Sequence, residues 1–173
     1  MKNILMSIRL YYFYCTYRGI KLREVRKKFP FNYKGKIYEY VSKTNWKQDL
    51  MKIPAEEREF FKQFVGKVGL CFECDKVEDY VYGHKWSWEQ GAPMWGADNS
   101  YEKILKDACL TDDEIRDYVE DLSFSAIHIT KLEIFDKPKE ISEFKPYNIK
   151  KHHVFDNFKL TRAPRNGWCY VEV

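Results

Sequence analysis

The stretch GIKLREVR at positions 19–26, of the form G-x-K-x-x-E-x-R, decides the fold because it turns the end of a helix into a strand. We expect a short helix over residues 8–17, with Gly19 well placed to end it in a left-handed conformation. The alternation that follows predicts a strand over residues 20–28, which Pro30 stops.

Side chains alternate along such a strand, so Glu24 and Arg26 are expected on the face of Ile20 and Leu22, pointing into a barrel or its mouth. A charged pair among apolar neighbours costs desolvation free energy and needs a reason. One reason is function: Lys21 and Arg26 hold an anion or a base edge, while Glu24 accepts from an amino group. The alternative is a structural ion pair that pins the barrel.

The rest of the chain supplies further strands and a few helices. Alternating patterns predict strands over residues 36–41, 67–80, 126–135 and 168–173. Helices are predicted over residues 55–64 and 112–120, the second preceded by a capping box of Thr111 and Glu114. About five or six strands without a βαβ rhythm predict an α+β protein, a small mixed β-barrel flanked by helices. We expect one domain over residues 1–173, with an insertion near 42–65 and a Trp-rich loop near 82–101.

Composition favours a soluble, cytoplasmic protein. Hydrophobic residues make up 45% of the 173 positions and charged residues 32%, which is typical of a globular chain. No apolar run approaches the roughly 20 residues of a membrane helix, and no signal peptide is recognised. Five cysteines, an odd number, indicate reduced thiols. Cys71 and Cys74 form a lone C-x-x-C on an alternating strand, which favours core thiols over a metal site, and no cofactor is expected.

Charge is unevenly distributed, although the net charge is only +4. Residues 18–36 carry Lys and Arg with Glu24 as the only acidic residue, and residues 150–165 form a second basic stretch. This segregation predicts a basic face suited to phosphates, and Arg23 within it is a further candidate ligand-binding residue. The alternative is ordinary solvated charge on helices and strands.

Two further pairs of side chains are candidates for ligand contact. Trp86 and Trp88, in the Trp-rich loop, could stack on unpaired bases; the alternative is that they fill a satellite core. Arg162 and Arg165 could border the same cleft as the motif, and otherwise lie in an exposed basic loop.

Four segments in order resemble ASCH domains of the PUA-like superfamily, which are common in bacterial and phage genomes. The segments are SIRLYYFYCTYRGIKLREVRK, GKVGLCFECDKVEDY, AIHITKLEIFDKPKEISEF and LTRAPRNGWCYVEV. The resemblance implies a β-barrel flanked by helices, a cleft at the motif and an RNA-associated role.

Some small ASCH proteins are amidohydrolases that deacetylate N4-acetylcytidine with a lysine, a threonine three residues later and a distant glutamate. Lys21 matches the lysine, whereas Glu24 stands in place of the threonine. Glu78 and Glu89 are candidates for the distant glutamate. The replacement of the threonine by Glu24 removes the hydroxyl that such an enzyme would use.

The leading hypothesis is therefore a nucleic-acid or nucleotide-binding module, with RNA as the preferred class and no membrane or metal partner. The alternative is a hydrolase acting on a modified nucleoside, with Lys21 and Glu24 as catalytic residues. A third hypothesis is a phage accessory protein that binds a host protein or a signalling nucleotide.

Overall fold

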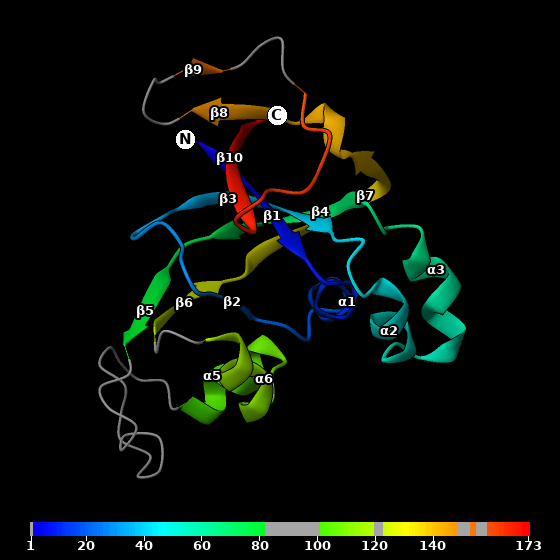
Figure 1. Cartoon of the computed structure of the whole chain (residues 1–173), viewed down its shortest axis with the longest axis vertical. Coiled ribbons are helices and arrows are strands. Elements are labelled where there is room, and N and C mark those ends of the chain that lie inside the picture. The colour runs from blue at the N-terminus through cyan, green and yellow to red at the C-terminus, as the bar shows by residue number, and fades with distance from the viewer. Residues whose placement is uncertain (1, 82–100, 120–122, 149–152, 155–158) are drawn as a thin grey trace. The chain divides into compact units, whose positions relative to one another are not determined.

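The computed structural model describes residues 2–81, 101–119, 123–148, 153–154 and 159–173, and its chain forms two compact units (Figure 1). The first unit comprises Met1–Arg18, Gly35–Glu73 and Lys131–Val173, and the second comprises Gly19–Lys34 and Cys74–Thr130. The expectation of one domain over the whole chain stays a prediction.

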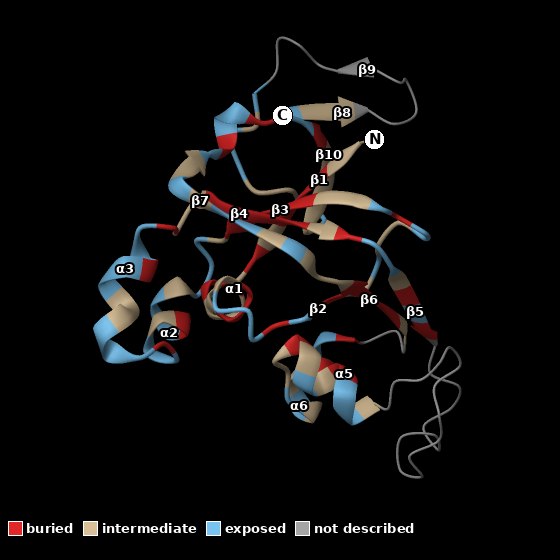
Figure 2. Cartoon of the chain, turned by 180° about the vertical axis from the view of Figure 1, so that it is seen from behind, coloured by how far each residue is buried: buried red, intermediate tan, exposed pale blue. Residues whose placement is uncertain are grey.

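The first unit is built on a seven-stranded sheet in the order β7-β4-β3-β1-β10-β8-β9. The strands are β1 (Asn3–Ile8), β3 (Gly35–Val41), β4 (Lys67–Cys74), β7 (Thr130–Glu140), β8 (Lys145–Asn148), β9 (His153–Val154) and β10 (Trp168–Glu172). Strand β1 pairs with β3 in parallel and with β10 in antiparallel fashion. Buried residues gather along β1, β3 and β4 (Figure 2).

Strand β1 is absent from the sequence prediction, which placed a helix from residue 8 onward. Ile4, Leu5 and Met6 are all fully buried, so this strand is covered on both faces. A strand covered on both faces reads as a continuous apolar run without alternation. The predicted helix begins later, as α1 (Leu10–Tyr17), and Gly19 follows it with a positive φ of 67° as expected.

Helices α1 and α3 (Arg58–Lys62) of the first unit pack against each other through aromatic side chains. The other helical elements of this unit are α2 (Trp46–Met51) and the 3-10 turns η1 (Ala55–Glu57) and η2 (Ile141–Glu143). The ring of Phe13 lies 5.0 Å from that of Phe64, and a Cβ at Gly69 would come within 2.5 Å of both. Gly69 therefore lets these rings approach β4. The helix predicted over residues 55–64 is confirmed as η1 and α3.

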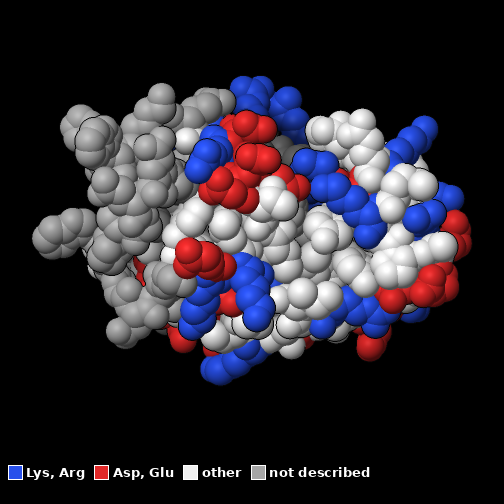
Figure 3. Space-filling model, turned by 90° about the horizontal axis from the view of Figure 1, so that it is seen from below, with Lys and Arg blue, Asp and Glu red and all other residues white. Residues whose placement is uncertain are grey.

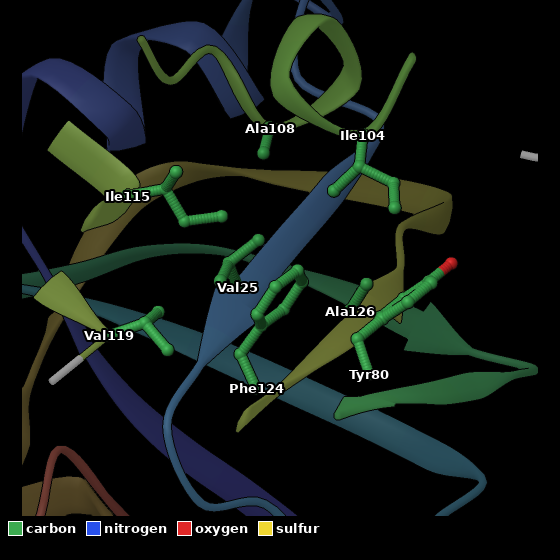
Figure 4. Close-up of a cluster of buried hydrophobic side chains, with 8 residues drawn as sticks. All are labelled: Val25, Tyr80, Ile104, Ala108, Ile115, Val119, Phe124 and Ala126. Carbon is green, nitrogen blue, oxygen red and sulfur yellow. The ribbon is translucent and has the colours of Figure 1, made fainter. Parts of the chain in front are cut away.

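The second unit combines a three-stranded antiparallel sheet with two helices. The sheet runs in the order β2 (Arg23–Arg26), β6 (Ser123–His128), β5 (Val77–Val81), and the helices are α5 (Tyr101–Ala108) and α6 (Asp112–Tyr118). The capping box of Thr111 and Glu114 is confirmed at the start of α6. A shared core joins the sheet to both helices (Figure 4); it contains Val25, Tyr80, Ile104, Ala108, Ile115, Val119, Phe124 and Ala126.

Two predicted strands are each divided in the structure. The alternation over residues 67–80 becomes β4 and β5, and that over residues 126–135 becomes β6 and β7. The two halves of each predicted strand join different sheets. The alternation of side chains with a period of two residues predicts a strand but does not reveal which sheet that strand joins. The strand predicted over residues 20–28 is shorter and covers only β2.

The mixed α+β class is confirmed, whereas the described strands of the predicted small mixed β-barrel do not close into a barrel. In the part of the chain that the structure describes, each sheet has two open edges, formed by β7 and β9 in one and by β2 and β5 in the other. No helix among the described residues has both the length and the apolar character needed to span a bilayer.

Candidate functional site

The last four residues of the motif form β2, an edge strand whose register with β6 assigns its side chains to two faces. Arg23 lies opposite His128, Glu24 opposite Ile127, and Val25 opposite Ala126. Directly opposed residues share a face, and successive residues alternate. Val25 and Ala126 belong to the core beneath α5 and α6, so Arg23 shares that helix-packed face. Glu24 lies on the other face.

Lys21, Glu24 and Arg26 form what we call the motif cluster. The ammonium of Lys21 donates to one carboxylate oxygen of Glu24, and Nε of Arg26 lies 2.8 Å from the other. Lys21 and Glu24 are each only 4% exposed. Burial raises the pKa of Glu24, but the positive charges of Lys21 and Arg26 and their hydrogen bonds outweigh it and hold that pKa below its ordinary value.

The surroundings of this cluster differ from the sequence prediction. Ile20 and Leu22, expected on the same inward face as Glu24, are 55% and 52% exposed. The reason is that β2 begins only at Arg23, so regular alternation does not extend back to Ile20. The grouping of Lys21 with Glu24 and Arg26 nevertheless holds.

A second group, the helix-face cluster, surrounds the carboxylate of Glu78 on β5. That carboxylate accepts from the guanidinium of Arg23 and from Nζ of Lys76 at 2.5 Å, and it lies 3.1 Å from Nε2 of His128. The hydroxyl of Tyr80 donates to it at 3.3 Å. Burial raises the pKa of Glu78, but the hydrogen bonds from Lys76 and His128 and the charge of Arg23 together lower it to about 2.

Helix α5 completes the helix-face cluster. Its Asp107 carboxylate accepts from Nε of Arg23 at 3.2 Å, and its backbone carbonyl accepts from the Leu22 amide at 2.7 Å. Neither α5 nor Asp107 was predicted from the sequence as part of the site. The helical spacing of Ile104 and Ala108, both fully buried, is the signal that could have found this helix.

The structure brings together only some of the predicted site residues. Lys21, Glu24 and Arg26 are in contact, whereas Arg23 pairs with Glu78 and Asp107 on the helix-packed face. Glu78, a candidate for the distant glutamate of the hydrolases, thus contacts Arg23.

The remaining candidates lie elsewhere in the chain. Arg162 and Arg165 are exposed, in the segment of the first unit that precedes β10. Trp86, Trp88 and Glu89 lie outside the described residues.

The two thiols of the C-x-x-C are buried and have different partners. Cys71 donates to the Glu133 carboxylate at 3.4 Å, and Cys74 donates to the carbonyls of Tyr33 and Lys76. Burial raises their pKa values to about 12 and about 11. The prediction of core thiols is confirmed, and over the described ranges no group of His, Cys, Asp or Glu side chains is arranged to hold a metal ion.

Surface charge is mixed on the side of the molecule that shows α5 and α6. Lys and Arg side chains are interspersed there with Asp and Glu rather than forming one field (Figure 3). This side is therefore not the uniformly basic face that the charge pattern predicts.

The chain shares its fold with solved structures of ASCH proteins from Zymomonas mobilis. A tyrosine-to-phenylalanine variant matches with a TM-score of 0.54 at 13% identity, covering 99% of this chain and 91% of that one. An ASCH structure from the same organism matches with a TM-score of 0.54 at 12% identity, covering 99% of this chain and 88% of that one. No family model and no curated protein matches the sequence.

Proposed function

We propose that the chain is a nucleic-acid or nucleotide-binding module, with RNA as the preferred class, and that the motif cluster is its contact site. One observation carries the proposal: Lys21 and Arg26 place two positive charges around the single carboxylate of Glu24, in a setting where Lys21 and Glu24 are almost fully buried.

Buried ammonium and guanidinium groups are costly unless opposite charges or hydrogen-bond acceptors compensate them. A phosphate or a base edge supplies such compensation, because a guanidinium and an ammonium both donate to these groups. The PUA-like, RNA-associated character implied by the ASCH resemblance agrees with this assignment.

The hydrolase alternative receives less support from the same contacts. A lysine that activates a nucleophile has to contact that nucleophile, whereas Nζ of Lys21 donates to the carboxylate of Glu24. The lowered pKa of Glu24 keeps its carboxylate ionised near neutral pH, which makes it a poor general acid and a weak base. Both groups are thus better suited to holding a ligand than to moving protons.

The test measures the affinity for a fluorescein-labelled single-stranded oligouridine by fluorescence anisotropy over a series of salt concentrations. We expect affinity to fall linearly with salt on a double-logarithmic plot, with a slope of about −0.7 per phosphate contacted. Lys21→Gln and Arg26→Gln should weaken binding while thermal melting shows a folded protein. Lys62→Gln is the matched control, because Lys62 lies on α3 and its side chain is 49% exposed.

Three outcomes separate the candidates. Absence of binding at low salt would refute the polymer-binding version. Unchanged binding by both motif variants would show that the motif cluster is a structural ion pair rather than the contact site. Native mass spectrometry with modified nucleosides provides the last distinction, since cytidine appearing from N4-acetylcytidine in a Lys21-dependent manner would favour the hydrolase.

A further inference from the structure

The turn between β2 and β3, residues 29–33, presents an aromatic side chain to solvent. The amide of Tyr33 donates to the carbonyl of Pro30 at 3.3 Å, which closes a four-residue turn. Asn32 has a φ of 55°, as the third residue of a type II turn requires, and asparagine tolerates this conformation. Phe31, the second residue, is 73% exposed, the largest value among the exposed large hydrophobic side chains of the described residues.

This turn is held in place at its base. The rings of Phe29 and Tyr33 meet edge to face with centroids 5.7 Å apart, and Tyr33 is 8% exposed. The thiol of Cys74 donates to the carbonyl of Tyr33 at 3.4 Å. Phe31 therefore lies on an anchored turn. Because the backbone of this turn is already fixed, presenting the aromatic ring to a ligand costs little further conformational entropy.

The turn is flanked only by positive charge along the chain. Between Val25 and Gly35 there is no Asp or Glu, whereas Lys27, Lys28 and Lys34 lie on either side of Phe31. Lys28 and Lys34 are exposed, and Nζ of Lys27 lies 5.4 Å from the ring of Tyr118 on α6. A protruding ring between cations matches a strand of nucleic acid, in which each unpaired base is bordered by phosphates.

We propose that Phe31 is a stacking platform for an unpaired base of single-stranded nucleic acid, and that Lys28 and Lys34 contact the phosphates beside that base. The inference rests on the proposed nucleic-acid-binding function. It adds a contact point on the turn that is distinct from the motif cluster.

The experiment compares two anionic polymers, a fluorescein-labelled oligouridine and inorganic polyphosphate, which has phosphates but no bases. Phe31→Ala should weaken oligouridine binding about tenfold, the effect of losing one stacked base, and leave polyphosphate binding unchanged. Phe31→Leu should weaken oligouridine binding similarly, because leucine is apolar but has no aromatic face, whereas Phe31→Trp should retain it. Lys28→Gln with Lys34→Gln should weaken binding of both polymers and reduce the salt slope.

Phe60→Ala on α3 is the matched control, because Phe60 is also an exposed phenylalanine, at 46%, and should leave oligouridine affinity unchanged. If the wild-type protein binds oligouridine and Phe31→Ala or Phe31→Leu binds it with the same affinity, the stacking role is overturned. The nucleic-acid-binding function is not overturned by that result. An equal loss for polyphosphate would also overturn the stacking role, since that polymer has no base to stack. Absence of oligouridine binding by the wild-type protein would overturn both this inference and the polymer-binding function.

Discussion

Arg23 and Glu24 are neighbours in the sequence, yet their side chains lie on opposite faces of the β2-β6-β5 sheet and in different ion-pair clusters. Arg23 joins the face that packs against α5 and α6, whereas Glu24 joins Lys21 and Arg26 on the other. One short strand thus anchors the helices of the second unit with one face and holds the proposed ligand contacts with the other.

Replacing Arg23 should destabilise the protein strongly. The Arg23→Met variant removes the guanidinium shared by Glu78 and Asp107 and leaves buried carboxylates with less compensation. We expect the free energy of unfolding, measured by urea titration with circular dichroism, to fall by about 3 kcal/mol or more. Arg116→Met is the control, because Arg116 is half exposed in its pair with Asp112 and should cost at most about 0.5 kcal/mol. Equal losses in the two variants would contradict the anchoring role of Arg23.

Stability should decrease in acid because of Glu78. Its pKa lies at about 2 in the folded protein and at an ordinary 4.5 in the unfolded chain, so the unfolded state binds the proton more readily. The stabilisation is fully present above pH 4.5 and is lost as pH falls from 4.5 towards 2, by at most about 3 kcal/mol.

Urea titrations between pH 7 and pH 2.5 would measure this loss, and Glu78→Gln should flatten the profile in that window. The lowered pKa of Glu24 acts in the same direction, so some acid sensitivity should remain in the variant. An unchanged profile in Glu78→Gln would show that other groups cause the acid loss.

The ion pair of Lys21 and Glu24 should be energetically coupled. A double-mutant cycle with Lys21→Met and Glu24→Gln is expected to give a coupling free energy of about 1.5 kcal/mol or more, because both side chains are nearly buried. Lys62 and Glu59 on α3 have the same spacing but are 49% and 89% exposed, and their cycle should give about 0.5 kcal/mol or less. Similar couplings for the two pairs would mean that burial does not strengthen the first.

The thiol of Cys71 should be inert while the protein is folded. Burial raises its pKa to about 12, so the reactive thiolate is scarce at pH 8. Alkylation by iodoacetamide, followed by peptide mass spectrometry, should modify Cys71 far more slowly in the native protein than in urea. Rapid labelling without denaturant would contradict the core position of this thiol.

Several elements of the fold were predictable because their signals are local. Gly19 ends α1 with a positive φ, and the capping box of Thr111 and Glu114 begins α6. Strand β1 was not predictable in the same way, since Ile4 and its neighbours are buried on both faces and show no alternation. The division of residues 67–80 into β4 and β5 was also hidden, because the choice of sheet depends on distant pairing partners.

The sequence by itself determined that Glu24 and Arg26 would meet, because residues two apart on a strand point to the same face. Lys21 joins them because regular alternation begins only at Arg23. Only the tertiary structure decided the partners of Arg23. Glu78 is 55 residues away along the chain and Asp107 is 84 residues away. Their contact depends on the register of β2 and β5 on β6 and on the packing of α5 against that sheet, which are set by burial of the shared core rather than by any local pattern.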